Sequence, residues 1–199
     1  MRFYSFCYDA CLQWCCSTAS ADYSCAQINE FFGIFFILLG ISAFVNTLIL
    51  DKPSSILWFC YLGIFLIGVG ILWKNPVLIT SQLNILFIPL LIWTFDFLYL
   101  VITGTSILGI TDYFFNPGFP IISRLISTQH IFTIPVSLFI LKKIKSKKVK
   151  YAWIASFIQL ILVFIITIIL TDAEDNINCV YKSCGNLYFG PASLYPLVW

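Results

Sequence analysis

The chain has 199 residues, of which 60% are hydrophobic and only 10% are charged. A soluble domain carries about 25% charged residues, so this composition excludes a soluble enzyme and indicates an integral membrane protein. The formal net charge of +2 gives no sign of a nucleic-acid partner. Because the sequence also lacks phosphate-loop, zinc-finger and haem motifs, we predict no nucleic-acid partner and no cofactor.

Residues 1–28 are predicted to form an interfacial helix and a linker on the cytosolic side. The first 17 residues contain no glycine or proline, and polar residues recur every three or four positions, at Arg2, Ser5, Asp9, Gln13 and Ser17. The opposite face consists of aromatic, aliphatic and cysteine residues. This pattern is typical of an amphipathic helix lying in the membrane interface.

Cysteines in this segment allow three interpretations. They are Cys7, Cys11, Cys15, Cys16 and Cys25. Zinc sites usually need CxxC-type knuckles and histidine, and a helical row of cysteines offers neither, so we predict no metal site. Lipidation of cytosolic thiols and plain apolar packing remain as the alternatives.

Residues 29–171 are predicted to form an all-α bundle of five transmembrane helices. Runs of about 18 or more apolar residues are typical of membrane spans. The predicted spans cover residues 31–50, 56–73, 83–103, 121–141 and 152–170. In the second span, Gly63, Gly68 and Gly70 would allow close helix packing. The tail, 172–199, carries Cys179 and Cys184, which we expect to form a local disulfide on an oxidising side of the membrane.

Six lysines within Lys142–Lys150 (KKIKSKKVK) determine the predicted orientation. Lysine and arginine accumulate in cytoplasmic loops, so this loop and the N-terminus would be cytoplasmic and the C-terminus extracytosolic. A lysine cluster can also bind anionic headgroups, and membrane lipids are the partners we expect. Cleavage of a signal peptide after Ala19-Ser20-Ala21 would export the six lysines, and we therefore disfavour it.

Three ionisable residues interrupt the apolar spans: Asp96, Arg124 and His130. Such residues cost about 2.5–3.5 kcal/mol each at bilayer depth and usually face the bundle interior. From the helical rise, Asp96 would lie roughly 10 Å and His130 roughly 14 Å below the outer face. We predict a polar pocket in the outer half of the membrane, with Asp96 paired to His130 or Arg124, which could receive a small molecule or a lipid. The predicted pocket residues are Asn46, Asp96, Tyr99, Arg124, Ser127 and His130.

The pocket allows several functions. Structural pairing of helices, transport or proton relay, catalysis, and a scaffold that binds other membrane proteins all fit polar residues in a bundle. The loop of residues 104–120 (GTSILGITDYFFNPGFP) would cap the pocket and be anchored by Tyr113, Phe114 and Phe115.

The stretch NPGFPIISRLISTQHIFTIPVSLFI, residues 116–140, resembles the androgen-induced-gene family of multi-pass membrane hydrolases. A Pro-Gly turn precedes a helix that carries a histidine, with a proline five residues later. The resemblance implies hydrolysis of lipid esters, with Thr47 as nucleophile and His130 as the base that takes its proton. The family has a sixth span, and the final SLYPLVW resembles the start of a further helix.

Overall fold

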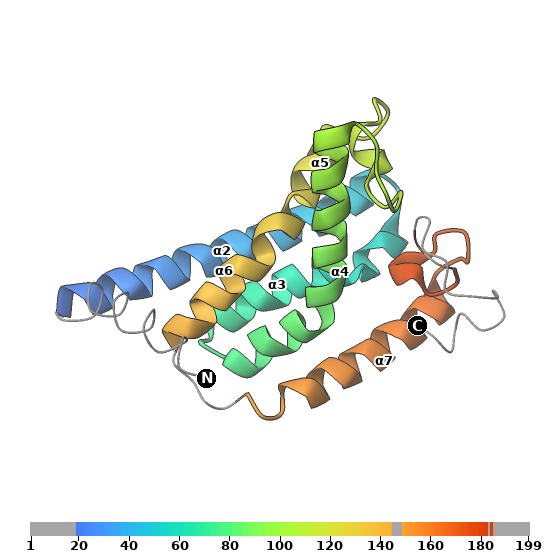
Figure 1. Cartoon of the computed structure of the whole chain (residues 1–199). Helices are drawn as coiled ribbons and strands as arrows, with labels where there is room; N and C mark the ends of the chain where they lie inside the picture. The colour runs from blue at the N-terminus through green and yellow to red at the C-terminus, as the bar shows by residue number, and fades with distance from the viewer. Residues whose placement is uncertain (1–18, 145–148, 183, 185–199) are drawn as a thin grey trace, which may run out of the picture.

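The computed structural model describes residues 19–144, 149–182 and 184, with side chains from residue 27 onward (Figure 1). These residues form helices joined by loops and contain no strand, which confirms the all-α class. The predicted interfacial helix lies outside the described residues, as do Cys7, Cys11, Cys15, Cys16 and the side chain of Cys25. In chain order the elements are α2 (Ala19–Ile49), η1 (Pro53–Leu57), α3 (Phe59–Leu72), α4 (Pro76–Thr103), η2 (Asp112–Phe115), α5 (Ile121–Ser127), α6 (Gln129–Ile144), α7 (Ala152–Leu170) and η3 (Ile177–Cys179).

Four segments in the described part of the chain are long and apolar enough to cross a membrane. They are Gln27–Ile49, Pro76–Thr103, Ile121–Ile144 and Ala152–Leu170. Four of the five predicted spans are therefore confirmed, and the second stays a prediction. There, α3 has 14 residues, a length of about 21 Å against a hydrocarbon core of about 30 Å. The start of the apolar run is taken up by the separate 3₁₀-helix η1, which begins at Pro53.

The short helix α3 packs closely against both α2 and α4. A Cβ atom on Gly68 would lie 2.8 Å from the carbonyl oxygen of Gly33 and from the amide nitrogen of Ile37, both on α2. A Cβ atom on Gly70 would lie 2.9 Å from Ile79 Cγ1 on α4. Small residues let helix backbones approach in this way, so the packing role predicted for these glycines is confirmed.

Helix α4 begins seven residues earlier than the predicted third span. The Asn75 side chain accepts hydrogen bonds from the amides of Val77 and Leu78, and Pro76 occupies the first turn, where its missing N–H costs nothing. The helix bends partway along (Figure 1) and contains Pro89, whose ring displaces the preceding turn. The C-terminal half of α4 thereby carries Asp96 toward the loop of residues 104–120.

The predicted fourth span is divided into α5 and α6 at Thr128, and α7 completes the bundle. Helix α7 packs mainly on α4, and most of its apolar surface faces outward, including Trp153, Phe157 and Ile161. Exposed apolar side chains on a long helix are what a lipid environment requires.

Candidate binding site at the loop-capped end

The carboxylate of Asp96 is fully buried and is bound by the loop that follows its own helix. Its Oδ1 accepts the amides of Ile107 at 2.9 Å and Leu108 at 2.7 Å. Its Oδ2 accepts the amide of Ile110 at 3.1 Å, and the amide and the hydroxyl of Thr111 at 3.0 and 2.8 Å. Five donors thus satisfy the charge, because the chain turns back after Gly104 and points consecutive amides at one carboxylate.

The predicted pairing of Asp96 with His130 or Arg124 is wrong. No salt bridge or hydrogen bond joins Asp96 to either side chain among the described residues, and both carboxylate oxygens are occupied by the loop. Arg124 instead donates from Nη2 to the carbonyl of Asn116, while its Nε is buried without a partner in this part of the chain.

Within the loop, two further contacts fix its shape. Ser106 donates its hydroxyl to the Asp112 carboxylate and accepts the amide of Gly109 at 3.0 Å. Gly104 and Gly109 have φ angles of 80° and 69°, which a residue with a Cβ atom adopts only with strain. The loop is therefore a folded cap. Hydrogen bonds between its own residues and hydrogen bonds to Asp96 of α4 hold it in place.

An aromatic cluster forms a second attachment of the cap. The Phe114 ring meets Phe97 of α4 edge-on, with centroids 4.7 Å apart, and Tyr113 packs on Phe119 at 4.7 Å. Trp93, one turn before Asp96, donates from Nε1 to the Tyr113 hydroxyl at 3.0 Å. Burial raises the pKa of the Tyr113 phenol above its usual value, so that the hydroxyl stays protonated and able to donate. The anchoring expected of Tyr113 and Phe114 is thus visible, and Phe115, although 57% exposed, stacks on Phe97 with ring centroids 6.5 Å apart.

Three of the predicted pocket residues lie on a hydrogen-bonded path beneath the cap. Tyr113 donates to Ser127 Oγ at 3.3 Å, Ser127 donates to the Ser123 carbonyl at 2.9 Å, and Asn46 of α2 donates to Ser123 Oγ at 2.9 Å. His130 joins through its ring, which stacks on Trp93 with centroids 4.5 Å apart. Since a carbonyl oxygen only accepts, the 2.6 Å contact with Ser127 places the His130 proton on Nδ1.

The remaining predicted residues are used differently. Tyr99 is 38% exposed. Thr47 is 3% exposed and donates its hydroxyl to the Phe44 carbonyl of its own helix at 2.7 Å. Thr47 and His130 share no hydrogen bond in the region that the structure describes, so their assignment as nucleophile and base stays a prediction.

An open hollow of about 730 Å³ lies beside the cap, where α4 ends. Its apolar wall consists of Leu100, Val101 and Phe115. Its polar wall comes from the loop, at Gly104, Thr105, Ser106, Asp112 and Asn116. Asp112 and Ser106 were not predicted as site residues, because nothing in the spacing of a polar loop marks which side chains border a hollow.

Polar contacts between α4 and α7 were also not predicted. Gln82 and Gln159 exchange amide hydrogen bonds at 2.7 and 3.0 Å, and Ser156 donates to the Ser81 carbonyl at 2.9 Å. A signal was present, since polar residues 81, 82, 156 and 159 interrupt apolar segments. The predicted third span, which began at 83, excluded half of them.

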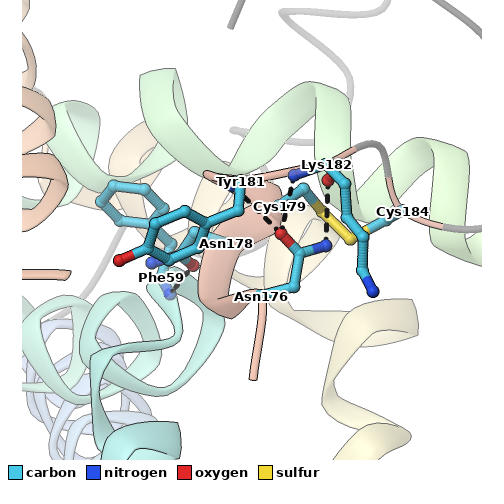
Figure 2. The surroundings of a disulfide bond; sticks show 7 residues. All are labelled: Phe59, Asn176, Asn178, Cys179, Tyr181, Lys182 and Cys184. Atoms are coloured by element: carbon cyan, nitrogen blue, oxygen red, sulfur yellow. Dashed lines mark hydrogen bonds between the residues drawn. A yellow bond between two sulfur atoms is a disulfide. The ribbon is translucent and has the colours of Figure 1, made fainter. Parts of the chain in front are cut away.

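After the end of α7, the predicted disulfide joins Cys179 to Cys184 (Figure 2). It closes a short loop around Asn176, whose side chain binds the backbone of Tyr181 and Lys182. Asn178, directly before Cys179, accepts the amide of Phe59 at 2.8 Å and donates to the Leu57 carbonyl at 2.8 Å. The loop thereby caps the beginning of α3, 119 residues away in the sequence.

Fold and site together define a class: a multi-pass membrane protein with a folded cap over one end of its helices. Comparison of the chain with protein-family models, curated proteins and solved structures finds no match in any of the three. The resemblance to the androgen-induced-gene family therefore stays a prediction.

Proposed function

We propose that this membrane protein acts by binding, and that the capped end of the bundle, residues 104–120 with the outer half of α4, is its recognition surface. The observation that carries the proposal is the use of Asp96. Its carboxylate accepts five hydrogen bonds from the cap and is fully buried. A charge buried in this way stabilises one loop conformation, which supports a preformed site.

The same contacts weigh against the alternative roles of these residues. A proton relay through Asp96 would have to break several loop contacts with each proton transfer. A hydrolase would have to release the Thr47 hydroxyl from the Phe44 carbonyl and bring it to His130. The scaffold alternative is a form of the same proposal, with a membrane protein as the ligand of the cap.

We further propose that α3 crosses the membrane as a fifth, shorter span and that the capped end faces the extracytosolic side. The support is the six lysines within Lys142–Lys150. Helix α6 ends and α7 begins at the end of the bundle that lies opposite the cap, and lysines accumulate in cytoplasmic loops. The sequence contains no Asn-X-Ser/Thr acceptor, so an acceptor tag can report sidedness in a secretory expression system. We expect glycosylation of a tag placed after Trp199 and none of a tag placed before Met1; the reverse result would contradict the orientation.

The binding proposal is tested with the full chain in a neutral detergent. A panel of lipids, amines, organic acids, sugars and peptides is screened for compounds that raise the unfolding temperature. We expect the stabilising compounds to act on the wild type and on an Asp172→Asn control, and to lose their effect in Asp96→Asn. Compounds that stabilise all three proteins equally, or a panel without any stabilising compound, would contradict binding at the cap.

A further inference from the structure

The hollow beside the cap is rich in hydrogen-bond acceptors at the end of α4. An α-helix leaves its last carbonyls without intrahelical partners and carries about half a negative charge there. The Gly104 amide donates to the Leu100 carbonyl at 2.9 Å, and the amides that follow it in the loop have other acceptors. The amides of Ile107 and Leu108 go to Asp96, and the amide of Thr105 goes to the Thr103 hydroxyl.

Asp112 adds a full negative charge to this wall. Its carboxylate accepts a hydrogen bond from Ser106, and no salt bridge pairs it with a cation among the residues that the structure describes. Arg124 is bound to the lining at another point, where its Nη2 donates to the Asn116 carbonyl. The polar wall therefore carries one carboxylate that forms no ion pair within the described residues.

The opposite wall is apolar and includes an aromatic face. Leu100 and Val101 lie on the last turns of α4, and the Phe115 ring is 57% exposed. Aromatic rings attract cations, and quaternary ammonium groups in particular. The volume of about 730 Å³ falls within the roughly 300–1,000 Å³ of small-molecule sites.

We propose that this hollow binds an organic cation, namely an ammonium group carried on an apolar body. The ammonium group would lie between Asp112 and Phe115, near the carbonyl end of α4, and the apolar body would lie along Leu100 and Val101. This inference rests on the proposed binding function and names its ligand class. Two sources have this chemistry: the choline or ethanolamine headgroup of a zwitterionic lipid, and a free amphiphilic amine.

The test uses the full chain in dodecylmaltoside and measures saturable binding of tritiated decyltrimethylammonium. The positive charge is examined with the neutral isostere, in which carbon replaces nitrogen. We expect saturable binding of the ammonium probe, with no displacement by the isostere. Asp112→Asn should weaken binding by about tenfold, and Phe115→Leu by about threefold.

A matched control separates the local charge from the general surface charge. Asp172 is an exposed aspartate just after α7, and Asp172→Asn removes the same charge outside the hollow. This variant should bind the probe as the wild type does. Asp112→Asn keeps an acceptor for Ser106, and amide exchange of Ile107 and Leu108 checks that its cap is intact.

A competition arm distinguishes the two sources. Displacement of the probe by diheptanoylphosphatidylcholine would identify a lipid headgroup as the ligand, and displacement by amines alone would identify a free organic cation. Equal binding by the wild type and an intact Asp112→Asn, or no saturable binding, would overturn the inference. The binding function itself would survive that result if compounds of another class still stabilised the protein in an Asp96-dependent manner.

Discussion

At the scale of single residues, the buried Asp96 carboxylate accepts five hydrogen bonds from one loop, which replace the hydrogen bonds it would form with water. In Asp96→Asn the added NH₂ group would face amide donors and leave at least one of them unsatisfied. Each buried donor without a partner costs about 1–3 kcal/mol, so we expect a loss of about 2–5 kcal/mol in unfolding free energy. Faster hydrogen exchange at Ile107, Leu108, Ile110 and Thr111 would show that the cap is the part released.

Asp172→Asn is the control for this prediction, because it removes an exposed carboxylate and should change the unfolding free energy by less than about 0.5 kcal/mol. If Asp96→Asn exchanged its loop amides as slowly as the wild type, Asp96 would not be what anchors the cap.

The partners of Asp96 show where prediction from the sequence reached its limit. Asn46 and Ser127 were predicted to line a pocket inside the bundle, and both are buried and hydrogen-bonded. A charged partner was expected for Asp96 because a sequence identifies charged side chains but not which backbone amides point at a carboxylate. Backbone amides are present at almost every position, so a loop that points four of them at one carboxylate has no signature in residue type.

At the scale of elements, apolar runs predicted the positions of the helices well, but they did not predict where a helix begins when its first turns are polar. The predicted span of residues 152–170 coincides with α7. The start of α4 was missed because Thr80, Ser81 and Gln82 were assigned to a loop. In the structure, Ser81 and Gln82 belong to the helix and bind α7. Helix α3 is shorter than its apolar run because the run begins within the separate 3₁₀-helix η1, and hydropathy does not distinguish the two kinds of helix.

The contact between α4 and α7 leads to a prediction on the reciprocal amide pair. Gln82→Leu and Gln159→Leu should each destabilise the protein, because each leaves an unpaired amide inside the bundle. The double variant should recover part of that loss, with a coupling energy of about 0.6–2 kcal/mol. The measurement is a double-mutant cycle of unfolding free energy in mixed detergent micelles.

Gln27→Leu is the matched control for the cycle, since Gln27 is exposed on α2 and should add its effect independently to either single variant. Strictly additive effects of Gln82→Leu and Gln159→Leu would show that the two amides do not interact.

At the scale of the whole molecule, the chain after α7 connects the last helix to the beginning of α3. Tyr181 donates its hydroxyl to the Thr171 carbonyl at 3.0 Å, which holds the loop at the end of α7. Asn176 and Asn178 have φ angles of 44° and 53°, which asparagine tolerates better than most residues. The loop thus joins two helices that otherwise make few direct contacts, since α7 packs mainly on α4.

The disulfide should therefore stabilise a contact on another element. Closing a loop of this size contributes about 2 kcal/mol in the chain-entropy model, and the double variant Cys179→Ser/Cys184→Ser loses that contribution. Because the loop then orders Asn178 less well, we expect faster hydrogen exchange at the Phe59 amide, which donates to the Asn178 side chain at 2.8 Å.

Asn178→Ala is the control variant, and it should release the same amide with the disulfide intact. Reductant should accelerate this exchange in the wild type and leave the double serine variant unchanged. A Phe59 amide that responds to Asn178→Ala but to neither disulfide change would show that Asn178 caps α3 without help from the disulfide.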